Sequence, residues 1–149
     1  MGLRHLALFL HLTGVVFWVG GMVFIRACLA TSMLTGAQWI QVLERFFPLA
    51  WASIAFITLS GVFALFDTGF ARAPLGWLLM AVTGSIMIAV FVSLRLGPWR
   101  DLRAALAADG QARARERAEA ALRGIDRYLD IILALAAVTA TAATFGLGL

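Results

Sequence analysis

The chain has 149 residues, of which 62% are hydrophobic and only 13% are charged, and its formal net charge is +4. Soluble globular domains carry about 25% charged residues, so this composition excludes an ordinary soluble protein and indicates an integral membrane protein. Only short polar links separate the apolar segments. We therefore expect one membrane domain over 1–149, with no appended soluble catalytic domain.

The first apolar segment covers about 6–25 and contains His11. A hydrocarbon core needs about 20 apolar residues per helix, so this segment predicts the first membrane-spanning helix. An ionisable side chain at membrane depth indicates a functional site, because its burial is costly without a partner. Gly14, Trp18 and Gly21 follow His11 at helical spacing and lie on one stripe of the helix. We expect this stripe to face other helices.

The first link contains an amphipathic segment that precedes the second predicted span, 49–66. We expect it to form a short helix along the cytoplasmic membrane surface. Pro48 is expected in the first turn of the span, where its missing N–H is tolerated. The link 67–74 is short, so the second and third spans are expected to be antiparallel neighbours. The apolar side of the amphipathic segment consists of Trp39, Ile40, Leu43, Phe46 and Phe47.

The third predicted span covers about 76–94 and the fourth about 128–147. Small residues recur every fourth position in both, and membrane helices associate where small residues allow close approach. We expect these ladders to meet other helices. The serines and threonines of the second and third spans can bond a carbonyl one turn earlier, so no role is assigned to them. The ladders are Ala81, Ser85, Ala89 and Ser93 on the third span, and Ala136, Ala140, Thr144 and Gly148 on the fourth.

The link between the third and fourth spans is rich in arginine. Pro98 is expected to start a short helix with Trp99, Leu102 and Leu106 on one face, and Asp109-Gly110 to break it before an alanine-rich helix. Arginines alternate with carboxylates here, which indicates a solvated helical hairpin that lies in the membrane interface and touches anionic lipid headgroups, not a nucleic-acid site.

Asp130, at the start of the fourth span, is expected to pair with Arg127 three residues before it.

Arginine placement predicts the topology. All twelve basic residues are arginine, and ten of them lie in or beside the first link and the long link. The positive-inside rule then places both links in the cytoplasm and both termini outside. We expect a multi-pass protein of the bacterial inner (plasma) membrane, in an all-α four-helix bundle with short interfacial amphipathic helices in the cytoplasmic links.

Imidazole and thioether side chains are the candidate metal ligands. Met22 lies on the first span, and Met80 and Met87 share a face of the third. Together with His11 they suit copper(I), although methionine also fills irregular helix contacts and His11 could be a hydrogen-bonded packing residue. His5 lies about 120° round the helix from His11, so the two cannot readily bind one metal from the same face.

Motifs spread over almost the whole chain resemble one family. The chain resembles the CopD-like family of small integral membrane proteins, named for copper resistance, and is distantly similar to the HemJ protoporphyrinogen oxidase family. The motifs are His11 with Gly14, Trp18-Val19-Gly20-Gly21-Met22, Arg45-Phe46-Phe47-Pro48 with Trp51, Ser60-Gly61, Ala73-Pro74-Leu75, Met87-Ile88 and Gly97-Pro98-Trp99-Arg100-Asp101-Leu102-Arg103.

The resemblance implies a site on the first span. In HemJ-like proteins a histidine of this span is implicated in haem b binding, which implies His11, with Trp18 on its stripe, as cofactor-binding residues. Two departures stand out: the family's histidines near the ends of the third span are replaced by Leu78 and Ser93, and the chain contains no lysine. Either the site has been lost, or Met80, Met87 or another subunit completes it.

Three functions remain open from the sequence. The first is copper handling, by transport or resistance, with His11 and the methionines as ligands. The second is a haem b membrane redox protein with His11 as axial ligand. The third is a non-catalytic scaffold or accessory subunit. Enzyme motifs are lacking, so an enzyme is not the expected outcome; the expected partners are the anionic bilayer, a second copy or another membrane subunit.

Overall fold

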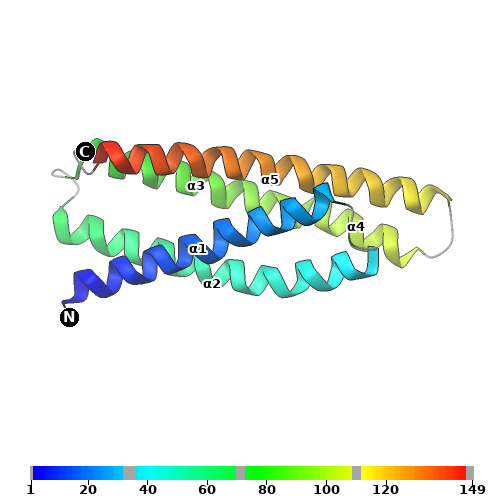
Figure 1. The fold of residues 1–149 in the computed structure, drawn as a ribbon, viewed down its shortest axis with the longest axis horizontal. Helices are drawn as coiled ribbons and strands as arrows, with labels where there is room; N and C mark the ends of the chain where they lie inside the picture. The colour runs from blue at the N-terminus through cyan, green and yellow to red at the C-terminus, as the bar shows by residue number, and fades with distance from the viewer. Residues whose placement is uncertain (1, 32–35, 70–72, 109–111, 147–149) are drawn as a thin grey trace.

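The structure is a computed structural model that describes residues 2–31, 36–69, 73–108 and 112–146. These residues form helices and no strand, in an elongated bundle (Figure 1). The antiparallel helices α1 and α2 form one pair, and α5 runs back along α3 and α4. The elements are α1 (Leu3–Ala30), α2 (Gly36–Thr68), α3 (Leu75–Leu96), α4 (Pro98–Ala107) and α5 (Ala112–Gly146).

Three stretches of the described residues are long and apolar enough to cross a membrane: Leu3–Ala30, Gln38–Thr68 and Leu75–Ala107. The predicted fourth span, 128–147, falls in α5, and its last residue lies outside the described residues. The all-α class is confirmed and the four-span count fits the fold, while the sides of the membrane on which the termini lie stay a prediction.

The expectation that Pro48 lies in the first turn of its helix is wrong. α2 is one helix of 33 residues, and Pro48 lies inside it. Trp39, Leu43 and Phe47 are buried, so the amphipathic segment turns its apolar side to the protein core and continues directly into the span. Proline leaves the carbonyl one turn earlier without its helical partner, which membrane helices tolerate. No separate surface helix forms there.

α4 begins at Pro98, as predicted, but its apolar side does not face lipid headgroups. Trp99 and Leu102 are 5% and 0% exposed, because α4 packs on α5 and on the ends of α2 and α3. The alanine-rich segment is part of α5, a single helix of 35 residues. The predicted break at 109–110 lies outside the described residues.

The glycine stripe of α1 is confirmed as its contact with α2. A Cβ atom on Gly14 would come within 2.8 Å of Ile57 and of the Ser53 carbonyl oxygen. A Cβ atom on Gly21 would overlap the ring of Phe46. These two glycines therefore set the close approach of α1 to α2 and fix which face of α1 is turned inward.

The ladder predicted on the third span is on the wrong face. All four of its small residues are exposed in α3, and the buried side chains are instead large ones: Met87, Phe91 and Leu94. Met87 contacts Thr139 of α5, and the Phe91 ring meets aromatic rings of α1 and α2, so the buried side of α3 lies between α5 and the α1–α2 pair. On α5, Ala136 is half-buried and Ala140 exposed, and the side chains of the ladder's last two members lie outside the described residues.

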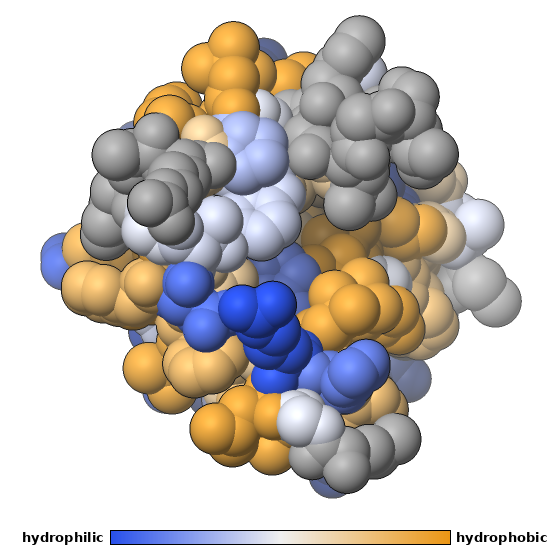
Figure 2. Space-filling model, turned by 90° about the vertical axis from the view of Figure 1, so that its left-hand side faces the viewer, coloured by the Kyte–Doolittle hydropathy of each residue, from blue (hydrophilic) through white to orange (hydrophobic). Residues whose placement is uncertain are grey.

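The two ends of the bundle differ in packing. We call 2–13, 55–69, 73–86 and 137–146 the terminal half, and the rest the arginine half. The terminal half contains the start of α1, the end of α2, the start of α3 and the end of α5, which lie at the left in Figure 1. Of the residues described in the terminal half, only Ser60 and Gly76 are buried. All the buried hydrophobic side chains of the core lie in the arginine half. Figure 2 views the terminal end and shows a recess between apolar side chains, with hydrophilic residues near its centre.

Candidate functional site

His11 lies in the terminal half, where α1 faces α2. Its ring atom Nδ1 is 3.0 Å from the hydroxyl oxygen of Ser60. Ser60 is 7% exposed, and its Oγ also lies 2.5 Å from the Phe56 carbonyl oxygen and 3.0 Å from that of Ile57. The histidine itself is half-buried. This imidazole is therefore anchored on one nitrogen.

The Ser60 contacts select a tautomer of His11. A hydroxyl carries one proton, and the short contact to the Phe56 carbonyl indicates that the proton is donated there. With the Ser60 proton donated in this way, Ser60 Oγ accepts the Nδ1–H of His11, and in that tautomer the lone pair is on Nε2. A neutral imidazole whose other nitrogen is held by a hydrogen bond is the form that binds a metal ion.

Trp18 lies seven residues after His11 on the same face of α1, about 10 Å further along the helix axis. It is 3% exposed and meets Phe91 of α3 edge to face, with ring centroids 6.1 Å apart. Its Nε1 donor is buried and has no hydrogen-bond partner among the residues that the structure describes. Trp18 thus joins the two helix pairs in the arginine half, near its boundary with the terminal half and away from the His11 ring.

The Trp18–Phe91 contact is a reference point from which positions along α1 and α3 can be compared, because the two helices run in the same direction (Figure 1). On the rise of 1.5 Å per residue, Met87 and Met80 lie about 6 and 16 Å from this contact towards the terminal end, on either side of the level of His11. Met22 lies about 6 Å in the other direction. It is 0% exposed in the core of the arginine half, so it is separated from His11.

Met87 is 4% exposed and turns towards α5, where its sulfur lies 3.8 Å from the hydroxyl oxygen of Thr139. Thr139 also bonds Thr83 at 2.8 Å, so polar contacts join α3 and α5 in the terminal half. Met80 is half-buried. A metal site that combines His11 with these thioethers stays a prediction, and the described residues contain no group of three or more His, Cys, Asp or Glu side chains placed for a metal ion.

The predicted Asp130–Arg127 pair is wrong. Asp130 binds Arg26 of α1, at 2.8 Å, and Arg26 also lies 3.2 Å from Asp126. The two carboxylates are one turn apart on α5, so one guanidinium can reach both. This cluster joins the first and last helices at the arginine end, and it lies far along α1 from His11.

Ser60 is the residue that sequence reasoning missed. It bonds a carbonyl one turn earlier, as predicted, but it also holds His11 from 49 residues away. No local pattern signals such a contact. At the positions where the family's other histidines are expected, Leu78 is 38% exposed and Ser93 bonds the Ala89 carbonyl of its own helix.

Comparison with known proteins gives one result. A family model described as Copper resistance protein D matches residues 40–145, a stretch that includes Ser60, Met80 and Met87 but begins after His11. No curated protein and no solved structure matches the chain.

Proposed function

Because the chain belongs to the copper resistance protein D family, we propose that it handles copper ions in the membrane, with copper as the ion it passes on. One geometric observation supports this proposal: the Ser60 hydroxyl lies 3.0 Å from Nδ1 of His11, so Nε2 is the ring nitrogen that would bind the ion. The bacterial inner membrane, with both termini outside, is part of the same proposal.

His11 acts as an exchangeable ligand in this proposal. Imidazole and thioether suit copper(I), and Met80 and Met87 lie on either side of the His11 level. One imidazole with few further ligands binds weakly, which favours transfer of the ion over storage. A second copy of the chain or another membrane subunit supplies any ligand that the single chain lacks.

A haem b protein is the alternative that uses the same nitrogen. Nε2 of His11 would be an axial ligand, and bound haem would supply one-electron redox chemistry. The other histidine, His5, is exposed and lies on the same helix, so it cannot approach the opposite side of the macrocycle. The second axial position would then be open or filled by another subunit.

Metal content and absorption of the detergent-purified protein test the proposal. We expect copper bound at up to one ion per chain, lost in His11→Ala and retained in His5→Ala. His5→Ala is the matched control, because it removes an exposed imidazole from the same helix. A Soret band in the unchanged protein that disappears in His11→Ala would show that His11 binds haem b and not copper. Protein that binds neither metal nor haem would overturn both and leave a scaffold.

A further inference from the structure

A groove lies between α4 and α5 in the arginine half, away from His11. It has a volume of about 480 Å³, and small residues form its floor: Pro98, Gly124 and the alanines at 104, 105, 120 and 121. The helices are close at one end, where a Cβ atom on Gly124 would lie 3.2 Å from Pro98. Beyond that contact the short alanine side chains do not fill the space between the helices.

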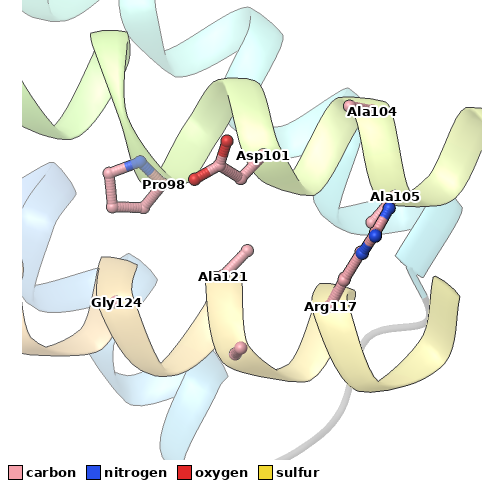
Figure 3. Close-up of a pocket in the computed structure, with 8 residues that line it drawn as sticks. Pro98, Asp101, Ala104, Ala105, Arg117, Ala121 and Gly124 are labelled. Carbon is pink, nitrogen blue, oxygen red and sulfur yellow. The ribbon is translucent and has the colours of Figure 1, made fainter. Parts of the chain in front are cut away.

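Two opposite charges face this groove. Figure 3 shows Asp101 extending from α4 beside Pro98, and Arg117 extending from α5 to the vicinity of Ala105. In the part of the chain that the structure describes, neither has an ion-pair partner, whereas the neighbouring Arg103 and Arg123 pair with Glu44 and Glu119. The groove therefore presents a carboxylate and a guanidinium separated by an apolar floor.

We propose that this groove binds the headgroup of a zwitterionic phospholipid that carries a primary ammonium group, as phosphatidylethanolamine does. Arg117 binds the phosphate by charge-assisted hydrogen bonds, and Asp101 accepts hydrogen bonds from the ammonium. Both charges of the groove are thereby used, whereas an anionic headgroup would leave Asp101 repelled and unpaired.

The surroundings favour a lipid over a soluble ligand. Leu96, at the end of α3 beside the start of α4, is 65% exposed and offers an apolar surface for an acyl chain. The helix that carries Arg117 continues into the apolar segment of α5. A lipid at the membrane boundary can therefore place its phosphate in the groove and its chains against the adjacent apolar surface.

Lipid retention in native mass spectrometry tests this proposal on the full chain. Delipidated protein is mixed with phosphatidylethanolamine, phosphatidylcholine or phosphatidylglycerol of identical acyl chains. We expect about threefold more bound phosphatidylethanolamine than either other lipid, the factor that one exposed charge pair contributes. Phosphatidylcholine keeps both charges but has no N–H to donate, and phosphatidylglycerol lacks the cation.

Single variants assign the two charges. Arg117→Gln should weaken binding of all three lipids, and Asp101→Asn should remove only the preference for phosphatidylethanolamine. Arg115→Gln and Glu116→Gln, which change exposed charges of α5 outside the groove, should change nothing. Melting temperatures of the variants confirm that each one folds.

Three outcomes overturn the proposal. Equal retention of the three lipids by the unchanged protein removes the headgroup preference. Competition by free phosphoethanolamine, at concentrations comparable to the lipid, assigns the groove to a soluble ligand. A charge exchange, Asp101→Arg with Arg117→Asp, that restores a melting temperature lowered by each single exchange identifies a direct ion pair that closes the groove.

Discussion

The arginine half and the terminal half are made of the same four long helices and pack them differently. In the arginine half the Phe91 ring contacts the rings of Trp18 and Phe47, and α4 packs on the ends of α2 and α3. In the terminal half polar contacts join neighbouring helices, among them His11–Ser60 and Thr83–Thr139. The stable core and the candidate site are thus in different places.

This difference has a functional consequence. A histidine that exchanges an ion needs open space on one side, and a tightly packed interior would fill that space with side chains. His11 is half-buried, so part of its ring is not covered by the protein, while the buried core of the arginine half keeps the helices in place. The comparison predicts that changes in one half affect stability and changes in the other affect binding.

The largest expected effect is the difference in activity between phosphatase fusions at the two ends of the bundle, because each end is expected to face a different compartment. A phosphatase fused after Leu149 should be active, because the positive-inside rule places the termini outside. A fusion after Ala108, between α4 and α5, should be inactive and serves as the control. The reverse pattern would show that the arginine half faces outward.

Phe91→Ala tests the arginine half. The ring is 1% exposed and contacts Trp18, Phe46, Phe47 and Trp51, so its removal should lower the free energy of unfolding by about 3–5 kcal/mol. Phe9→Ala removes the same ring from a site that is 65% exposed, and its expected effect is below about 0.5 kcal/mol. Thermal unfolding in detergent measures both, and similar losses would contradict the division into halves.

Ser60→Ala tests the terminal half. Without the hydroxyl, His11 loses the acceptor that holds its Nδ1, and copper affinity should fall about tenfold, as for other hydrogen bonds to metal ligands. Ser53→Ala is the matched control, because Ser53 is equally buried in α2 and bonds only the Leu49 carbonyl in the structure. Titration with copper(I) under a competing chelator measures the affinity. An unchanged copper affinity in Ser60→Ala would show that Ser60 does not contribute to copper binding.

Arg26→Gln should have the smallest effect, a modest drop in melting temperature. The guanidinium joins α1 to α5 through Asp126 and Asp130, but it is partly exposed to solvent. High salt screens such pairs, so the difference from the unchanged protein should shrink at about 1 M salt. Arg123→Gln, which breaks a pair within α5, is the control and should leave the melting temperature unchanged. A drop as large as that of Phe91→Ala would place this cluster in the core.

The spacing of residues in the sequence predicted the helices better than it predicted which helices pack against each other. The stripe of His11, Gly14, Trp18 and Gly21 could be placed from spacing alone, because glycine marks close approach and the helical period fixes the face. The exposed ladder on α3 shows the limit of that argument: small residues permit contact but do not say which face has a neighbour. On α3 the buried face instead carries the large side chains Met87 and Phe91.

Contacts between distant segments could not be predicted. Asp130 has Arg127 within one turn, yet it binds Arg26, because the packing of α1 on α5 brings that guanidinium closer. Ser60 shows the same difficulty: its bond within α2 is a local property, and its bond to His11 depends on how α1 crosses α2. Pro48 signalled a helix start, but burial of the preceding apolar residues extends α2 past it.

The separation of Arg26 from Asp130 also has a consequence in time. The two residues are 104 positions apart. At ~5–20 residues per second, a ribosome needs about 5–20 s to make the intervening chain. Throughout that interval the first helix is complete but its arginine has no carboxylate partner. The contact between Arg26 and the two carboxylates of α5 can therefore form only after nearly the whole chain has been made, and it is among the last contacts that α1 acquires.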